Sequence, residues 1–366
     1  MVDRQNFTVS DEIVPPEAIE PVAKPHPQVS DKLAHGLGLK MTGPAALTLR
    51  RQKRGKGWSY LHADGRVIRD TKIVKRLASM AMPPAYRDVR YAADPKAHLQ
   101  ATGRDAAGRL QYRYHADWEK VRETRKARRL GHLVGVLPSV RRSVAQHLSG
   151  GAPSREFALA AVIELVARSA IRPGNESYAK LHGTRGATTL LKSNVGVDGD
   201  TITLKFTGKG SKKIHKEVNA ARLASAIAVL LELPGKRLFQ YRDDAGAMHG
   251  VSSAQVNLFL REIAGVKTSL KDFRTLLASA AVLESLSRLS PAKSASGRRR
   301  QVLEAVRLAA GELHNTPTIC RKSYVHETIV TAFEDGILER FADTLKGCRS
   351  QAKREQVLAQ VIATAG

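Results

Sequence analysis

The chain has 366 residues, 42% of them hydrophobic, and a formal net charge of +26 with a pI near 10.4. Its length is too great for one small core, so two domains are expected. A charge of this size attracts polyanions, which makes a nucleic acid the expected partner and an anionic membrane surface the second candidate. Ribosomal proteins reach similar charges, so the charge by itself does not indicate catalysis.

The sequence contains no run of about 20 uninterrupted apolar residues, the length that a membrane helix needs. Residues 1–16 mix charged residues with isolated apolar ones and do not resemble a signal peptide. A cytoplasmic protein without a membrane partner is therefore expected. Cys320 and Cys348 are too few for a disulfide framework and lack a histidine set that would complete a zinc site. No pattern in the chain requires a metal or another cofactor.

Residues 1–38 are predicted to form a disordered tail. They contain five of the fifteen prolines and several acids. Such segments bury too little surface to offset the entropy lost on ordering.

Residues 39–120 are predicted to form a small β-rich domain. A hairpin is expected over Trp58–Ile68, with its turn at Asp64-Gly65, and a short helix over Ile73–Met80. A second hairpin is expected over Gln100–His115, and its return strand alternates so that Tyr112 and Tyr114 share one face. The basic cluster that begins at Arg50 is placed just before the first of these hairpins.

Residues 121–366 are predicted to form a larger, mainly helical domain. Ser154 is expected to cap an amphipathic helix that ends near Arg172, where Pro173-Gly174 breaks the pattern. Hairpin turns are expected at Asp198-Gly199 and at Gly208-Lys209-Gly210. Further helices are expected from about Ala220 onward, with a basic loop over Pro291–Arg300 and a docking helix at the end of the chain. The fold class predicted for the whole chain is α+β.

An ordered set of cations that ends in a tyrosine is the main indication of chemistry. The set comprises Arg172, Lys209, the tetrad Lys271-Asp272-Phe273-Arg274 and the run Asn315–Tyr324. Fixed cations neutralise a phosphate, and a phenol hydroxyl beside them can attack it. This combination predicts phosphoryl transfer on a nucleic acid backbone through a covalent tyrosine intermediate.

Each member of the set also has a simpler interpretation. Lys209 fits a solvated turn lysine, Arg172 fits a cation at a helix C-terminus, and Tyr324 fits a core or surface side chain. However, Lys271 and Arg274 share a helical face that has no acid, which favours a bound anion. The chain has neither a Walker A sequence nor a carboxylate cluster for two-metal catalysis. The phosphoryl transfer that remains needs neither a nucleotide nor a metal.

From about residue 55 to about residue 330, the chain resembles the type IB DNA topoisomerases in their compact, poxvirus-like and bacterial form. The resemblance implies a monomer in the bacterial nucleoid whose two domains form a C-shaped clamp on duplex DNA. It also implies that a tyrosine forms a 3′-phosphotyrosyl link, that the cut strand swivels to relax supercoils, and that the freed 5′-hydroxyl then re-ligates. Because the covalent bond conserves the energy, neither ATP nor a metal is implied.

The resemblance also assigns roles to individual residues. It makes Tyr324 the nucleophile, Arg172 and Arg274 the two catalytic arginines, and Lys209 the general acid on a hairpin. The side chains that it places on DNA are Gln111, Tyr112, Tyr114, Tyr178 and Lys271.

One position departs from the viral pattern, which has a histidine nine residues before the tyrosine. Asn315 occupies that position here, and His314 precedes it. Bacterial members of the family likewise carry asparagine. An asparagine amide donates a hydrogen bond without carrying charge, so Asn315 is favoured over His314 as the phosphate ligand.

Two alternatives stay open. A tyrosine recombinase shares the nucleophile and the order Arg, Lys, Arg, but it normally has a His-x-x-Arg box, whereas Lys271 occupies the histidine position here. A non-catalytic, basic nucleoid or RNA-binding protein accounts equally well for the charge. It does not account for a phenol placed after a Lys-x-x-Arg box.

Overall fold

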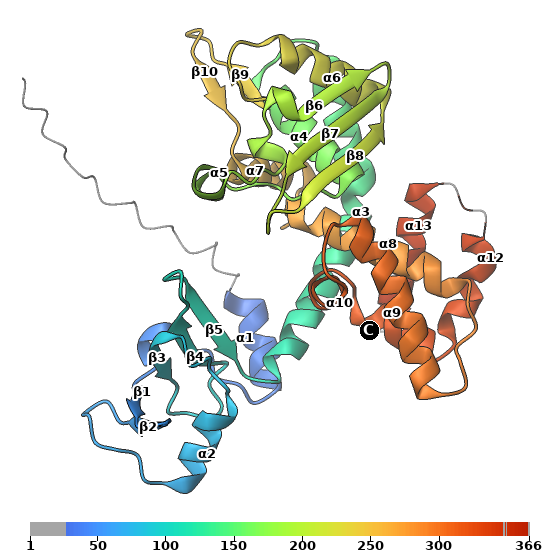
Figure 1. The fold of residues 1–366 in the computed structure, drawn as a ribbon. Coiled ribbons are helices and arrows are strands. Elements are labelled where there is room, and N and C mark those ends of the chain that lie inside the picture. The colour runs from blue at the N-terminus through green and yellow to red at the C-terminus, as the bar shows by residue number, and fades with distance from the viewer. Residues whose placement is uncertain (1–26, 347, 349, 365–366) are drawn as a thin grey trace, which may run out of the picture. The chain divides into compact units, whose positions relative to one another are not determined.

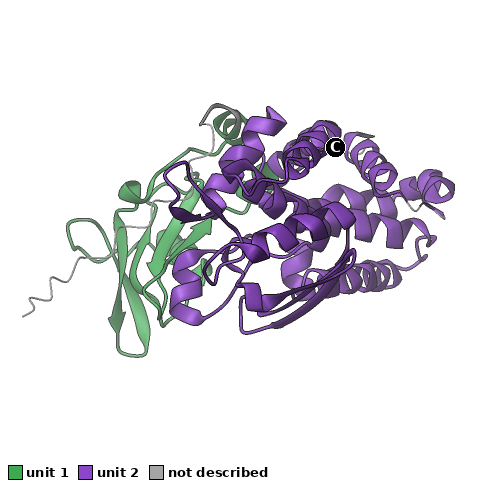
Figure 2. Ribbon diagram, turned by 90° about the horizontal axis from the view of Figure 1, so that it is seen from above, with its two compact units in different colours: residues 1–121 green, residues 122–366 purple. Residues whose placement is uncertain are grey.

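The computed structural model describes residues 27–346, 348 and 350–364. The chain divides into two compact units, Met1–Val121 and Arg122–Gly366 (Figure 2). The first unit is built on a small β-sheet, and the second is mainly helical with short hairpins, so the predicted α+β fold class is confirmed. Within the described ranges, no helix is long and apolar enough to cross a membrane.

The first unit contains a five-stranded antiparallel sheet in the order β2-β1-β3-β4-β5 (Figure 1). Its core comprises apolar side chains from these strands and from the following helix, among them Tyr91 and Leu77. The elements of this unit are α1 (Pro27–Gly36), β1 (Leu49–Arg54), β2 (Gly57–Leu61), α2 (Thr71–Ser79), β3 (Arg87–Tyr91), β4 (Leu99–Arg104) and β5 (Leu110–Tyr114).

The predicted tail is too long, because Pro27–Gly36 form helix α1. Ala34 in this helix and Leu39 just beyond it are buried in a cluster with Trp118 and Val121. These contacts supply the apolar burial that the sequence did not indicate. Residues 1–26 of the predicted tail lie outside the described residues.

The first predicted hairpin is confirmed only in part, whereas the second is confirmed. The chain does turn at Asp64-Gly65, where Ile68 donates to the Tyr60 carbonyl at 2.8 Å and a bridge joins Leu61 to Val67. Strand β2, however, pairs along its length with β1 across a turn at Gly55-Lys56. Gly55 adopts a φ of 55°, which a tight turn requires and glycine accepts readily. The basic cluster therefore lies within the sheet. In the second hairpin, Thr102 on β4 pairs with Tyr112 on β5.

The second unit has one large core that surrounds helix α4, most of whose residues are buried. The three-stranded sheet β6-β7-β8 lies beside α4 and α6 (Figure 1). Its helices are α3 (Trp118–Ser149, which begins in the first unit), α4 (Arg155–Ser169), α5 (Glu176–His182), α6 (Ala221–Glu232), α7 (Ser253–Ala264), α8 (Leu270–Ser287), α9 (Ala295–Glu312), α10 (Pro317–Ser323), α11 (Glu327–Glu334), α12 (Ala342–Leu345) and α13 (Gln351–Thr364). Its strands are β6 (Val195–Asp198), β7 (Thr201–Thr207), β8 (Lys213–Asn219), β9 (Gln240–Arg242) and β10 (Met248–Gly250).

Two helix boundaries in this unit differ from the prediction. Helix α4 begins after Ser154, whose hydroxyl accepts a hydrogen bond from the backbone of Phe157 as expected, but it ends at Ser169 rather than at Arg172. Ala170 ends it in a left-handed conformation, with φ 54°. The loop predicted over Pro291–Arg300 is also wrong, because Ser294 caps helix α9 there by accepting from Gly297.

Two loops cross closely at Gly186 and fix the segment that follows α4. A Cβ atom at Gly186 would lie 2.6 Å from the carbonyl oxygen of Arg172 and 2.5 Å from the nitrogen of Gly174. Gly174 itself has a φ of 100°, a conformation that L side chains rarely adopt. The backbone of Ala187 donates to the Arg172 carbonyl at 2.8 Å. The Arg172 backbone is therefore held by a contact that only glycine permits.

We expect Gly186→Ala to lower the free energy of unfolding by about 2 kcal/mol, since the new methyl group would overlap backbone atoms that cannot turn aside. Gly196→Ala is the matched control, because a Cβ atom there meets nothing within 4 Å. The control is expected to change stability by less than about 0.5 kcal/mol. Urea unfolding followed by circular dichroism measures both, and equal stability of the two variants would contradict the close crossing.

Candidate active site

The guanidinium of Arg274 lies at the centre of the predicted catalytic set. Arg274 is on α8 and is only 1% exposed. Its Nη1 donates to the carbonyl of Ala170, just after α4, and its Nη2 donates to the carbonyl of Leu313, just after α9, at 3.2 Å. Its Nε is buried and has no partner among the described residues. Burial lowers the pKa of Arg274, but arginine stays charged, so a fixed positive charge is buried here.

Arg172 and Asn315 are hydrogen-bonded to each other, and the amide nitrogen of Asn315 is left without a partner among the described residues. Arg172 Nη2 donates to Asn315 Oδ1 at 2.5 Å, across a sequence separation of 143 residues. The amide nitrogen of Asn315 is buried and, in the described part of the chain, has no hydrogen-bond partner. Because the oxygen is bonded to an arginine, the free group is a donor, as a ligand of a phosphate oxygen must be.

Tyr324 follows the short helix α10, which Thr316 caps and Pro317 begins. Its backbone is fixed, since Ser279 on α8 donates to its carbonyl at 3.0 Å. Its ring lies against two predicted site cations: the guanidinium carbon of Arg274 is 4.9 Å from the ring centroid, and the Nζ of Lys271 is 5.8 Å away. The structure therefore brings the predicted nucleophile together with both cations of the Lys-x-x-Arg box.

The charges around Tyr324 favour its phenolate. Burial is the largest single influence and by itself raises the pKa of Tyr324, which is 9% exposed. Arg274, through its charge and a hydrogen bond, together with the charges of Arg172 and Lys271, acts in the opposite direction and leaves the pKa below its ordinary value of about 10. A depressed pKa is what an activated oxygen nucleophile needs.

Cys320 lies one helical turn before Tyr324, but its chemical character is different. Its side chain is fully buried, and burial raises the pKa of the thiol to about 11, with Arg274 opposing this only in part. A thiol with such a pKa is a poor nucleophile near neutral pH. Among the neighbours of Arg274, Tyr324 is therefore the activated one.

Lys209 lies at the exposed tip of the β7–β8 hairpin, between Gly208 and Gly210, as predicted. It helps to line a cavity of about 10 Å³ that is also lined by Arg172, Arg274 and His314. That volume accommodates about one water molecule. The hairpin lysine and both predicted catalytic arginines thus border one small space, and Asn315 is bonded to one of those arginines.

Three of the residues predicted to contact DNA are tyrosines with well-exposed rings. Tyr112 and Tyr114 stack on the sheet of the first unit with ring centroids 6.2 Å apart, and they are 47% and 40% exposed. Gln111 donates to Asp105 at 2.8 Å. Tyr178 on α5 is 38% exposed and lies against His182. Exposed aromatic rings and amides of this kind suit contacts with a nucleic acid.

A second group of cations lies near Tyr324, and it was not part of the site predicted from the sequence. It lines a cavity of about 180 Å³ between α3, α8 and the end of α10. Arg129 bonds to Asp272 at 2.5 Å, and Lys126 bonds to the carbonyl of Val325 at 2.8 Å. The recurrence of arginine on one face of α3 was a usable indication of this group. The further lining residues include Arg122, Arg125, Lys271 and Lys322.

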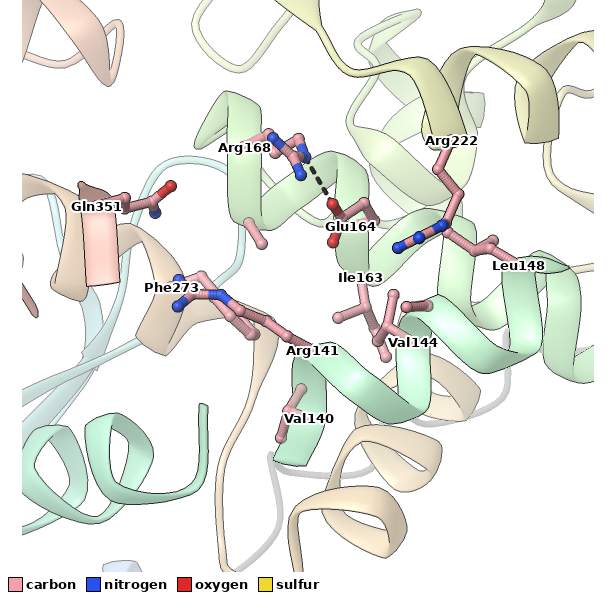
Figure 3. Close-up of a pocket in the computed structure, with 12 residues that line it drawn as sticks. Val140, Arg141, Val144, Leu148, Ile163, Glu164, Arg168, Arg222, Phe273 and Gln351 are labelled. Atoms are coloured by element: carbon pink, nitrogen blue, oxygen red, sulfur yellow. Dashed lines mark hydrogen bonds and ion pairs between the residues drawn. The ribbon is translucent and has the colours of Figure 1, made fainter. Parts of the chain in front are cut away.

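A separate hollow of about 130 Å³ lies between α3, α4, α6 and α8 and contains none of the predicted site residues (Figure 3). Its arginines are largely neutralised: Arg168 pairs with Glu164, as the dashed line in Figure 3 marks, and Arg141 pairs with Glu355 at 2.7 Å. The first pair lies within α4, and the second joins α3 to α13.

The lowered pKa of Tyr324 gives a measurable titration. In an ultraviolet titration at 295 nm, one tyrosine of the wild type should ionise below pH 10, and Tyr324→Phe should remove that component. Lys271→Gln should move it upward, because one of the cations that favour the phenolate is lost. Identical titration curves for the wild type and Tyr324→Phe below pH 10 would contradict the electrostatic description.

Comparison with known proteins gives an independent result. Residues 112–352 match the family described as eukaryotic DNA topoisomerase I, catalytic core, and residues 57–105 match the bacterial DNA topoisomerase IB N-terminal domain. The chain is 27% identical to the DNA topoisomerase 1B of Acanthamoeba polyphaga mimivirus over 282 residues, which cover 75% of this chain and 84% of the relative. It is 23% identical to the DNA topoisomerase 1B of Vaccinia virus (strain Copenhagen) and to the DNA topoisomerase I of Monkeypox virus, over 64% of this chain and 72% of each relative.

The catalytic-core match spans the five residues for which the sequence predicted a catalytic role, which are Arg172, Lys209, Arg274, Asn315 and Tyr324. It also covers more than half of the chain. The chain therefore belongs to the type IB DNA topoisomerase family, whose members act on duplex DNA, and it is an isomerase of that type.

Proposed function

We propose that this chain relaxes supercoiled duplex DNA by cutting and rejoining one strand through a 3′-phosphotyrosyl intermediate. The observation that carries the proposal is the packing of the Tyr324 ring against the buried guanidinium of Arg274, with the pKa of the phenol depressed. In this proposal the chain works as a monomer in the bacterial nucleoid and uses neither ATP nor a metal. The covalent bond stores the energy that rejoining needs.

In the cleavage step, Tyr324 Oη attacks the phosphorus, and the bond from phosphorus to the 5′-oxygen breaks. Lys209 donates a proton to the departing oxygen, and the phenol proton passes to solvent. Arg172, Arg274 and the free amide donor of Asn315 bind the non-bridging oxygens as negative charge grows on them. Arginine suits this role because it stays charged and offers several donors. Rejoining is the same step in reverse.

Residues outside the catalytic set contribute binding. Gln111, Tyr112 and Tyr114 on the first unit, and Tyr178 and Lys271 on the second, are proposed to contact the same duplex. In the proposal, both units clamp the DNA while the cut strand turns.

Tyr324→Phe should bind DNA like the wild type but form no covalent adduct, because the ring and its packing remain while the attacking oxygen is lost. The wild type should relax a supercoiled plasmid in EDTA without ATP, and denaturant should trap a protein–DNA adduct. Tyr324→Phe should do neither. Relaxation by Tyr324→Phe would refute the proposal.

The same assay separates the alternatives. A tyrosine recombinase would require paired specific sites and would exchange strands between them. A non-catalytic nucleoid or RNA-binding protein would leave no adduct even in the wild type.

Asn315→Ala should slow single-turnover cleavage by about 10²- to 10³-fold, since one preorganised donor to the phosphate is lost. Thr318→Ala is a control, because this residue is exposed on the neighbouring helix α10 and, within the described residues, makes no side-chain hydrogen bond to the site. Measurement uses a suicide substrate that prevents rejoining. Normal cleavage by Asn315→Ala would show that another residue is the phosphate ligand.

A further inference from the structure

His314 occupies a backbone position that suits glycine or asparagine better than histidine. It follows the end of α9 with a φ of 49°, in the left-handed region. Its backbone N–H donates to the Gly311 carbonyl at 3.0 Å, and that of Asn315 donates to Ala310 at 2.8 Å. Glycine fits such a helix terminus with the least strain, and asparagine is the second-best residue. The backbone thus gives no reason for an imidazole at this position.

The position of the side chain does give a reason. His314 helps to line the water-sized cavity that is also bordered by Lys209, Arg172 and Arg274, and the charges of both arginines act on its ring. In the described parts of the chain, no hydrogen-bond partner of the ring is found. His314, whose ring can still form hydrogen bonds, therefore borders the same very small space as the lysine proposed as the general acid.

The charges that face His314 come from every neighbouring element. Lys209, Lys212 and Lys216 come from the β7–β8 hairpin, Arg172 and Arg185 from the loops around Gly186, and Arg274 from α8; Glu312, on α9 itself, acts on Lys216. Burial first, and then the charges of Lys216, Lys212, Arg274 and Arg172, lower the pKa of His314 below its ordinary value of about 6.5. The ring is therefore neutral at neutral pH, and a neutral imidazole has one nitrogen that can only accept a hydrogen bond.

We propose that His314 is a positioning residue for Lys209: its unprotonated ring nitrogen accepts a hydrogen bond from the lysine ammonium and holds it toward the departing 5′-oxygen. The inference rests on the proposed function, because it needs Lys209 as the proton donor. During cleavage, one Lys209 proton passes to the 5′-oxygen as the phosphorus–oxygen bond breaks. Lys209 then regains a proton from solvent. The imidazole keeps its own proton throughout and acts only through the lysine.

The position permits a well-matched pair of variants. His314→Gly removes the acceptor and relaxes the backbone, so the fold should be retained and the melting temperature should not fall. His314→Asn tolerates the positive φ and supplies an amide oxygen that can accept from the lysine. We expect His314→Gly to slow single-turnover cleavage roughly tenfold, a fraction of the ~10²- to 10⁴-fold that a general acid contributes. His314→Asn should restore most of the rate.

A substrate with a bridging sulfur at the 5′ position of the scissile phosphate isolates the proton-transfer role. A thiolate leaves without being protonated, so the wild type and His314→Gly should cleave this substrate at the same rate. An equal defect of His314→Gly on the sulfur and oxygen substrates would mean that the ring acts only on structure, and it would overturn the proposal. A wild-type rate for His314→Gly on the oxygen substrate would do the same.

The pH profile is a second readout. Wild-type cleavage should fall as the pH drops below about 6.5, because protonation of His314 removes the acceptor and adds a charge beside Lys209. His314→Gly should lack this decline, and an identical acid limb in both proteins would count against the proposal. Wild-type adduct formation is measured first. Its absence would refute the proposed function itself, whereas a failure confined to the variant comparisons refutes only the role of His314.

Discussion

The buried positive charge of Arg274 is the constraint on which the second unit depends. Removing an ion from water costs several kcal/mol unless its donors are paired, and Arg274 is 1% exposed. Its partners are the carbonyls of Ala170 and Leu313, which follow the C-terminal ends of α4 and α9, where the helix dipole is negative. The Tyr324 ring covers the same guanidinium. One buried cation thus joins three segments that must meet for the proposed chemistry.

Three of the five non-glycine residues with a positive φ in the described part of the chain lie in the same region. Ala170, Ser211 and His314 have positive φ values of 54°, 58° and 49°. Ala170 directs its carbonyl to Arg274, Ser211 lies in the hairpin turn of Lys209, and His314 borders the cavity that these cations share. Non-glycine residues adopt this conformation at a cost and keep it only where surrounding structure fixes it. The well-buried core around α4 supplies that fixation, so the site is held by packing rather than by local preference.

Local patterns predicted the parts of the site, but not how they meet. Gly208 and Gly210 marked the Lys209 turn, Ser154 marked the start of α4, and the order of cations before Tyr324 indicated the chemistry. The burial of Arg274 could not be predicted, because a charged side chain is normally exposed and its partners are 104 and 39 residues away. Helix α9 was partly missed for a related reason: Ser294 caps it inside a segment whose composition suggests a loop.

Proximity to Arg274 does not by itself decide which side chain becomes the nucleophile. Arg274 favours ionisation of both Cys320 and Tyr324, yet the pKa of the thiol rises to about 11 and that of the phenol falls. The difference is that Arg274 also forms a hydrogen bond with the phenol, and that the charges of Arg172 and Lys271 add to its effect there. Several cations converge around the Tyr324 phenol and the Asn315 amide, and like charges repel at such range. A phosphate entering this space would relieve that repulsion, so the arrangement that favours the Tyr324 phenolate also favours binding of the group that the proposed function has it attack.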